Sequence, residues 1–344
     1  MGDSIFSVMM VAAPFVSEAE AEAFALTHWG ITCTAKLLTG ERDRNFRLRA
    51  TDHREYVLKF ANAAEDQAVT DMQIAGLAHV AGRDPDLQVP RMLPLPSGAM
   101  EALHGAIRVR LLSYVPGIPL RETTHTAAQR IACGKALARL GLALDGFAHP
   151  ASSTPLIWDL THTLRLREVL DAVPDADAQA QIADILDDFE SHILPVLPSL
   201  RRQVLYNDMN TGNVLIDPDN HDVVAGIIDF GDLVTTALAI DVAVGATSQI
   251  NETTTIPADI GDFVSGFHAT RPLLPAEIAV LPLLIACRLA MSLVLQAWHR
   301  QSHPDNPHYR PITVADLHRR LVMIDAVRGP ETTEAIRHAC QLGS

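Results

Sequence analysis

A short polar stretch near residue 210 contains side chains whose types and spacing suit chemistry. Residues 206–213 have the sequence YNDMNTGN, which places Asp208 and Asn213 five positions apart on a loop that runs into an apolar strand. Sixteen residues after Asn213, Asp229 begins the segment DFG at the end of a second strand-like run, Val223–Ile228. A carboxylate can orient an attacking hydroxyl and accept its proton. The oxygens of an Asp and an Asn can hold Mg²⁺ against phosphates.

The order D-x-x-x-x-N, a hairpin-length gap and D-F-G is the order of functional groups in kinase active sites. We therefore predict that Asp208 is a catalytic base, and that Asn213 and Asp229 are ligands of Mg²⁺. The alternative is that these residues only form turns, as Asp and Asn often do. The conjunction of the three parts in one order favours phosphoryl transfer.

Lys59 gives an independent indication upstream, because it follows Tyr-Val-Leu in a strand-like run. A lysine at this place in a kinase neutralises nucleotide phosphates, and an acidic residue on the following helix pairs with it. Asp71 is the expected partner and Glu65 is the second choice. The alternative is an ordinary solvated lysine, which most lysines are.

The loop of residues 39–45, TGERDRN, lies where a kinase has its phosphate-covering loop. It contains a single glycine, Gly40, and backbone N–H groups around it, with Arg42 or Arg44, can meet phosphate oxygens. A charged hairpin tip in solvent is the other interpretation. Tyr114, which ends a strand-like run, is the remaining residue that we assign to nucleotide binding.

Two regions of different pattern must position these residues. The first has a helix, then strand-like runs and a second helix, and the second is mostly helical with a β-rich insertion at 202–232. The strand-like runs of the first region are 35–38, 45–50, 56–60 and 107–114. We predict an α+β fold with a small lobe at 1–116, a larger helical lobe at 117–344 and a hinge at Val115–Pro119.

Composition limits the partners of the chain. The 344 residues are 48% apolar, so a sizeable core can be buried. Lys and Arg total 27 against 41 Asp and Glu, and the net charge of −14 argues against nucleic acid or an anionic membrane as the main partner. The four cysteines are far apart and form no CxxC pair, and the first residues lack the basic region of a signal peptide, so we expect a cytoplasmic protein. The composition is compatible with a homodimer of this chain.

One apolar segment, residues 278–298, is long enough to span a membrane. Arg288 lies at its centre, and a central arginine costs about 2.5–3.5 kcal/mol on insertion scales. We therefore expect a buried helix of a soluble protein that carries one charge.

With these residues in place, the chain resembles the aminoglycoside phosphotransferase and choline kinase superfamily of small-molecule kinases, and within it the hydroxylysine kinases. The matching segments extend over nearly the whole sequence: GERDRNF, YVLK, DMQ, WDL, YNDMN, GIIDFGD and HPDNPHY. The resemblance implies a two-lobed protein-kinase-like fold, Mg²⁺, and transfer of the γ-phosphate of ATP or GTP to a hydroxyl of a small amine or amino acid. Tyr206 stands where relatives usually have His.

The resemblance also implies that Asp241, twelve residues beyond Asp229, braces the catalytic loop. A plain helix N-cap is the alternative for this aspartate.

The acceptor should be bound by the helical lobe. Arg288 can hold a substrate carboxylate bidentately, or it can form a buried ion pair within the chain. Trp158 and Asp159 can flank an ammonium group by cation–π and charge contacts. We assign Asp232, together with Asp208, to the same substrate side.

Three functions remain in competition: an active small-molecule kinase, a catalytically weak module that binds nucleotide or metabolite, and a protein kinase. Retention of Lys59, Asp208, Asn213 and Asp229 favours the active enzyme over the weak module. The lack of an A-P-E segment after Asp229 argues against a protein kinase.

Overall fold

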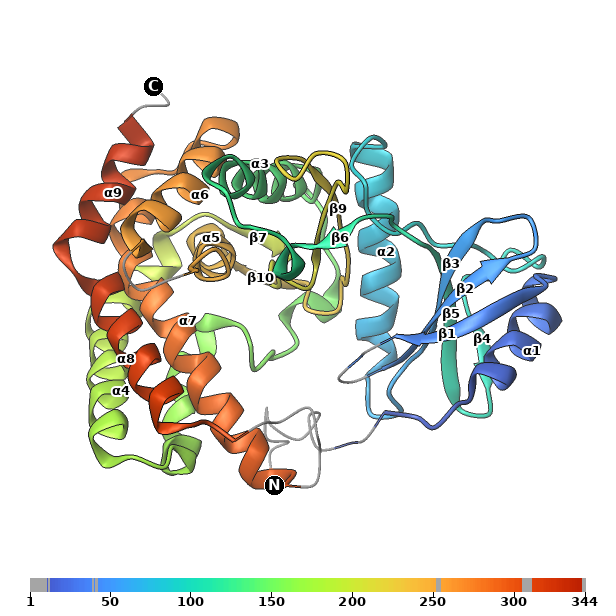
Figure 1. Cartoon of the computed structure of the whole chain (residues 1–344), viewed down its shortest axis with the longest axis horizontal. Helices are drawn as coiled ribbons and strands as arrows, with labels where there is room; N and C mark the ends of the chain where they lie inside the picture. Colours follow the sequence, from blue (N-terminus) through green and yellow to red (C-terminus); the bar gives the residue numbers. More distant parts are fainter. Residues whose placement is uncertain are drawn as a thin grey trace. The chain divides into compact units, whose positions relative to one another are not determined.

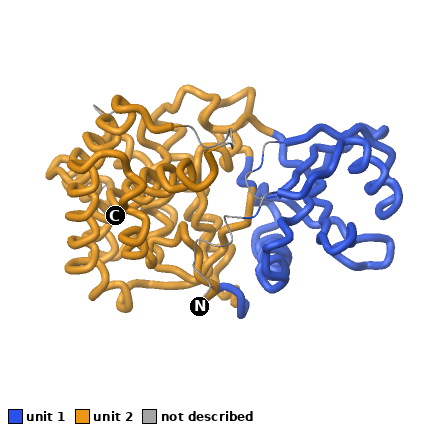
Figure 2. The backbone as a smooth tube through the Cα atoms, turned by 90° about the horizontal axis from the view of Figure 1, so that it is seen from below, with its two compact units in different colours: residues 1–116, 149–152, 226–228 blue, residues 117–148, 153–225, 229–344 orange. Residues whose placement is uncertain are grey.

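The fold is known from a computed structural model, which describes residues 11, 13–38, 40, 43–251, 255–304 and 311–341. The chain forms two compact units (Figure 2). Unit 1 contains Met1–Pro116 with the short segments His149–Ser152 and Gly226–Ile228. Unit 2 contains Gly117–Ala148, Ser153–Ala225 and Asp229–Ser344. A purely linear division at residue 116 therefore misses the two short segments that belong to unit 1.

Unit 1 is built on a five-stranded antiparallel sheet with strand order β1-β2-β3-β5-β4 (Figure 1). The strands are β1 (Cys33–Leu38), β2 (Arg44–Ala50), β3 (Glu55–Phe60), β4 (Ala102–His104) and β5 (Ile107–Ser113), and the helices are α1 (Glu18–Trp29) and α2 (Gln67–Arg83). Ser17 and Glu20 form a capping box that begins α1, and Gly30 ends this helix with φ of 68°.

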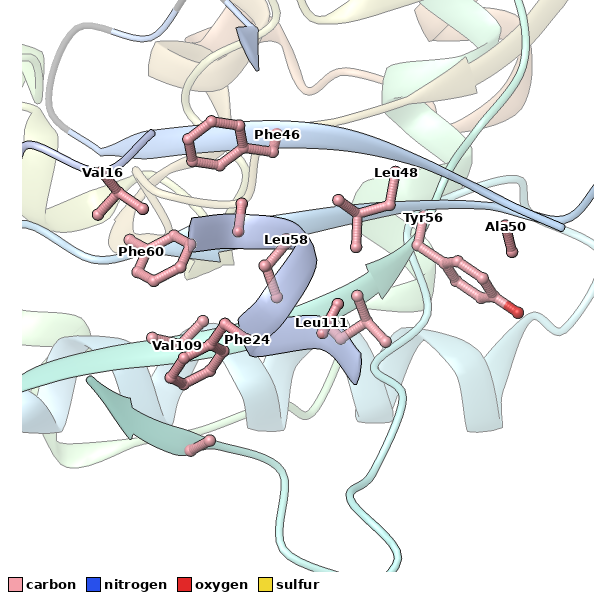
Figure 3. Packing of buried hydrophobic residues seen from close by; sticks show 13 residues of the cluster. Val16, Phe24, Phe46, Leu48, Ala50, Tyr56, Leu58, Phe60, Val109 and Leu111 are labelled. Atoms are coloured by element: carbon pink, nitrogen blue, oxygen red, sulfur yellow. The ribbon is translucent and has the colours of Figure 1, made fainter. Parts of the chain in front are cut away.

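Strict alternation along β2 and β3 separates two faces of this sheet. Phe46 and Leu48 of β2 and Leu58 and Phe60 of β3 are all fully buried, and Phe24 of α1 packs on Phe60 with ring centroids 5.5 Å apart (Figure 3). Because successive strand residues point to opposite faces, the intervening polar residues must lie on the other side.

The opposite face carries the charged residues of the sheet. Lys59 of β3 is the direct cross-strand partner of Asn45 on one side and of Arg110 on the other. Arg110 donates to Gln73 of α2 at 2.7 Å, so α2 lies against this charged face. The packing of one face thus fixes where Lys59 points.

Unit 2 is mainly helical (Figure 1). Its helices are α3 (Ala127–Ala143), α4 (Ala176–Asp188), α5 (Leu238–Thr247), α6 (Ile256–Thr270), α7 (Pro275–Ser302), α8 (Val314–Arg328) and α9 (Pro330–Gln341). Its strands are short: β6 (Ile118–Pro119), β7 (Arg202–Leu205), β8 (Val214–Ile216) and β10 (Val234–Ala237), with β9 (Val224–Ile227) ending inside unit 1. β7 pairs with β10, and β6 with β8, both antiparallel. The predicted α+β class is confirmed.

The apolar segment around Arg288 forms the long helix α7, which packs against α5 and α8. It is long and apolar enough to cross a membrane, but 67% of its most apolar 18-residue window is buried inside the fold. Contact with its neighbours therefore accounts for the apolar composition of α7, as the sequence analysis expects of a core helix.

Helices α3 and α6 approach each other closely at two glycines. A methyl group at Gly134 of α3 would lie 2.0 Å from the carbonyl oxygen of Phe263, and one at Gly266 of α6 would lie 2.0 Å from that of Ile131. Both obstacles are backbone atoms, so only glycine permits this approach.

Gly266→Ala should therefore lower the stability of the protein. Overpacking costs typically about 1–3 kcal/mol, and a backbone obstacle leaves little room to relax. Gly261→Ala on the same helix is the matched control, because its methyl group would meet Ala335 at an ordinary 3.6 Å. Helix propensity then makes Gly261→Ala neutral or stabilising by up to about 1 kcal/mol. Thermal unfolding of both variants measures the difference, and equal unfolding midpoints would show that the close helix approach is absent.

Candidate active site

The loop between β7 and β8 brings Asp208 and Asn213 together. The Asn213 Nδ2 group donates to Asp208 Oδ2 at 2.6 Å and to the Asp208 carbonyl oxygen at 3.1 Å. Asn210 donates from Nδ2 to Asp208 Oδ1 at 2.9 Å. Both oxygens of Asp208 are thus oriented, and because the amide nitrogen of Asn213 donates to Asp208, its Oδ1 atom is the one that could bind a cation.

Asp241 holds the start of this loop. The Asn207 backbone N–H donates to Asp241 Oδ1 at 2.8 Å, and Asn207 has the left-handed φ of 59°. A side-chain acceptor in place of regular strand pairing stabilises an unusual backbone conformation next to Asp208. The predicted brace is confirmed, and the N-cap alternative is wrong, because Ala237 precedes the helix and Asp241 lies inside its first turn.

Asp241 is almost fully buried, with 1% of its surface exposed. Burial raises the pKa of its carboxyl to about 7, while the Asn207 amide and the Arg271 charge act in the opposite direction. The carboxyl group of Asp241 therefore binds a proton more readily than the carboxyl group of an ordinary aspartate.

Carboxylates gather around Asp208. Burial raises the pKa of Asp208 well above its usual range, and the charges of Asp232 and Asp229 raise it further. The Asn210 hydrogen bond and the Arg288 charge lower it. Asp229 itself has a left-handed φ of 59° and accepts the Gly231 backbone N–H at 3.2 Å. Three acids that repel one another favour the presence of a cation.

The donor set of unit 2 fits Mg²⁺. Among the described residues, no group of three or more His, Cys, Asp or Glu side chains could enclose a metal ion. Asn213 and Asp229, which belong to the same unit, could supply hard oxygen atoms to such an ion. Mg²⁺ commonly binds through one or two protein oxygens, with water and phosphate completing the shell.

In unit 1, among the described residues, Lys59 pairs with Asp43, an acid that the sequence analysis does not single out. The Lys59 Nζ atom lies 2.9 Å from Asp43 Oδ2, and the Asn62 backbone N–H donates to Asp43 Oδ1 at 2.8 Å. Burial of the Asp43 carboxyl acts to raise its pKa. The charge and hydrogen bond of Lys59, the Asn62 amide and the Arg110 charge outweigh that effect, so the pKa of Asp43 lies below its ordinary value.

The predicted pairing of Lys59 with Asp71 is wrong. Asp71 is half exposed and pairs with Arg108 at 3.1 Å, and Glu65 lies 4.0 Å from Arg110. Asp71 and Glu65 lie near strand β5, where Arg108 pairs with Asp71 and Arg110 lies near Glu65. Asp43 reaches Lys59 because it directly precedes β2, whose first residues pair with the end of β3.

Arg110 is a second basic residue that the sequence analysis misses. Its side chain is only 3% exposed, it lies across from Lys59 in the sheet, and two of its nitrogens, Nε and Nη2, make no hydrogen bond within the described residues. The alternation of arginine and apolar residues in Ile107–Ser113 carries the signal, since it places Arg108 and Arg110 on the same face as Lys59.

The remaining residues predicted to bind nucleotide are placed as follows. A methyl group at Gly40 would lie 2.8 Å from the Asp43 carbonyl oxygen, so a side chain at this position would press on the Asp43 backbone. Tyr114 is covered by the Arg47 guanidinium, 4.1 Å from its ring centroid. Arg44 donates to the Val16 carbonyl oxygen at 3.2 Å. Arg42 lies outside the described residues.

On the predicted substrate side, Asp159 has a different role. Its carboxylate accepts hydrogen bonds from the Thr161 backbone and hydroxyl at 3.1 and 2.7 Å, and from the Thr236 hydroxyl at 2.8 Å, and the residue is 2% exposed. Its predicted contact with a substrate ammonium is therefore corrected: Asp159 caps a helical segment. The cation on the Trp158 ring is Arg288 of this chain, 4.7 Å from the centroid, instead of a ligand.

Comparison with known proteins identifies the family. Residues 34–273 match the phosphotransferase enzyme family. The chain belongs to this family. The match begins in β1 and ends just before α7, so it includes Lys59, Asp208, Asn213 and Asp229.

Individual relatives of this phosphotransferase are similar over most of its length. Mouse hydroxylysine kinase is 28% identical over 333 residues, covering 88% of this chain and 87% of the relative. A microcompartment-associated aminopropanol kinase has a TM-score of 0.68 at 18% identity, over 93% of this chain and 97% of that one. An amicoumacin kinase in complex with AMP-PNP and Ca²⁺ has a TM-score of 0.66 at 12% identity, over 91% and 93%. The predicted family resemblance and kinase-like fold are confirmed.

The Asp43 pair generates a prediction for this phosphotransferase. Asp43→Asn keeps an acceptor for the Asn62 amide but removes the charge that holds Lys59, so the KM for ATP should rise about tenfold, as expected for loss of a charged hydrogen bond. Asp71→Asn is the matched control on the exposed face of α2, and its KM for ATP should change far less. Steady-state kinetics with varied ATP decide between them. A larger rise in the KM for ATP with Asp71→Asn than with Asp43→Asn would support the pairing of Lys59 with Asp71 instead.

The brace generates a prediction on stability against pH. Because folding raises the pKa of Asp241 from 3.8 to about 7, the folded state keeps a proton that the unfolded state releases, and the contribution of Asp241 to stability declines as pH rises from about 4 to 7. Asp241→Asn keeps a neutral acceptor at every pH. Its unfolding free energy should therefore rise relative to the wild type across this window, as measured by urea denaturation. Parallel profiles for the two proteins would contradict the assignment.

Proposed function

We propose that this protein transfers the γ-phosphate of ATP to a hydroxyl group of a small amine-bearing molecule, of the hydroxy amino acid, amino alcohol or aminoglycoside class. The observation that carries the proposal is the orientation of Asp208. Its half-buried carboxylate is held by Asn210 and Asn213 on a loop braced by Asp241, in a chain of the phosphotransferase family. Similarity to hydroxylysine kinase and to kinases of other amine-bearing molecules supports the choice of acceptor.

Asp208 acts as the general base. Its carboxylate accepts a hydrogen bond from the acceptor hydroxyl, orients the oxygen for attack, and takes the proton as the new bond to phosphorus forms. The raised pKa of Asp208 suits it to receive a proton. Asn213 keeps the carboxylate in place through its 2.6 Å hydrogen bond.

Lys59 binds nucleotide phosphates, and Asp43 holds the lysine in position until they arrive. Asn213 Oδ1 and Asp229 would hold Mg²⁺, which when bound neutralises the phosphate oxygens and polarises the γ-phosphorus. The complex of a structural neighbour with AMP-PNP and Ca²⁺ supports a nucleoside triphosphate with a divalent cation.

We further propose a cytoplasmic location. ATP and Mg²⁺ are abundant there. The four cysteines, which all lie among the described residues, are free thiols, as expected in a reducing compartment.

Asp208→Asn tests the proposed function. Removing a general base costs typically about 10²- to 10⁴-fold in rate, and the isosteric amide should leave nucleotide binding in place. The assay measures phosphate transfer from ATP in Mg²⁺ to a panel of hydroxy amino acids, amino alcohols and aminoglycosides. Asp219→Asn, on an exposed turn of the same unit, serves as the control and should retain the wild-type rate.

Two outcomes would contradict the proposal. Full activity of Asp208→Asn would remove Asp208 from the chemistry. A wild type that binds ATP but phosphorylates none of the panel would favour the module that only binds nucleotide or metabolite.

A further inference from the structure

Arg288 is a buried cation in the most apolar helix of the protein. It lies near the middle of α7 with 9% of its surface exposed. Burial lowers the pKa of the guanidinium, whereas Asp208 and Asp232 raise it. An arginine remains charged in proteins, so its burial is costly unless hydrogen-bond partners compensate.

The partners of Arg288 within the chain are weak. Among the described residues, the guanidinium donates one hydrogen bond, from Nη1 to the Met291 sulfur at 3.7 Å, and stacks on the Trp158 ring at 4.7 Å. A thioether is a weak acceptor, and a stacked ring takes no N–H group in its plane. Within the described residues, Arg288 therefore makes no buried ion pair of the kind that the sequence analysis gives as the alternative.

Other arginines of unit 2 show what structural pairing looks like. Arg130 lies 2.7 Å from Asp262 and 3.2 Å from Asp259, and Arg201 pairs with the fully buried Glu277 at 2.5 Å. Arg288 has no such carboxylate in the described part of the chain, although it is more buried than Arg201.

Two donor atoms of Arg288 are unused within the described residues. The one hydrogen bond of the guanidinium uses Nη1, so Nε and Nη2 have no acceptor there. The Trp158 ring lies against the group, with its centroid 4.7 Å from the central guanidinium carbon. A fixed planar edge with two parallel N–H groups matches a carboxylate.

The position of this edge relates it to the reacting groups. Arg288 and Asp208 influence each other electrostatically, and Asp232 acts on both, yet no ion pair joins Arg288 to either acid within the described residues. An anion on Arg288 would therefore lie in the electrostatic surroundings that Arg288 shares with Asp208.

We propose that Arg288, oriented by Trp158, binds the carboxylate of the acceptor. The acceptor is then a hydroxy amino acid, and amino alcohols and amino sugars are poor substrates. This inference rests on the proposed kinase function and narrows its acceptor class.

The test compares acceptors that differ only in the carboxylate. 5-Hydroxylysine is paired with 1,5-diaminopentan-2-ol, threonine with 1-aminopropan-2-ol, and homoserine with 3-aminopropan-1-ol. For at least one pair, the wild type should have a kcat/KM about 10- to 100-fold higher for the carboxylated member, the usual effect of a charged hydrogen bond. This comparison needs no variant, so it holds even where a substitution at Arg288 prevents folding.

Arg288→Gln should bring the kcat/KM ratio of the preferred pair close to 1. Arg288→Lys, which keeps the charge but loses the planar edge, should give an intermediate ratio. Arg130→Gln is the matched control, because it removes an ion-paired arginine of the same unit and should leave the ratio as in the wild type.

Several results would overturn the inference. The wild type could phosphorylate both members of every pair equally well. Alternatively, Arg288→Gln could lower both members of a pair equally while raising the KM for ATP, which would assign the arginine to a phosphate group.

Failure of the kinase function itself is distinguishable. If no acceptor is phosphorylated, calorimetric titration of the same pairs decides the question. Tighter binding of the carboxylated member, about tenfold or more and lost in Arg288→Gln, supports the inference, and equal affinities refute it.

Discussion

The repulsion between Asp208 and its neighbouring carboxylates in unit 2 is the constraint on which the rest of this structure depends. The charges of Asp232 and Asp229 raise the pKa of Asp208, whose burial already disfavours its charged form. The fold tolerates this arrangement because Asn210 and Asn213 donate to Asp208, and because Asp241 fixes the strained Asn207 backbone. A bound cation would relieve the repulsion among these carboxylates. The electrostatic cost that they impose on the free protein would therefore favour binding of a cation with its nucleotide.

Unit 1 contains a similar electrostatic repulsion, here between two basic residues of its sheet. The inner face of its sheet is filled by aromatic and aliphatic side chains, which forces Lys59 and Arg110 side by side onto the other face. Two cations in direct cross-strand contact repel each other. Asp43, which directly precedes β2, offsets this repulsion through its ion pair with Lys59. Among the described residues, the ion pair with Asp43 thus holds the Lys59 side chain in place, and no acid of α2 takes that role.

The helical frame of unit 2 supports these short loops. Close contact between α3 and α6 depends on glycines that admit neighbouring backbone, and α7 buries most of its apolar surface. Within that frame, Arg288 is an expensive group to retain, since its only partners among the described residues are a sulfur, an aromatic ring and two acids beyond ion-pair distance. A cost of this kind is typical of a residue whose partner arrives with the substrate.

The sequence by itself determined the fold class, the family and the residues of the catalytic loop. Asp208 and Asn213 are five positions apart on one loop, so local geometry alone brings them together, and the alternation in β3 predicts a strand that ends near Lys59. Only the tertiary structure decided the partners. Lys59 pairs with Asp43 instead of Asp71. Asp159 accepts a hydrogen bond from Thr236, and Arg288 lies over Trp158. These three contacts depend on strand register and helix packing. Those contacts join residues far apart in the chain, and no local spacing encodes which acid reaches a given cation first.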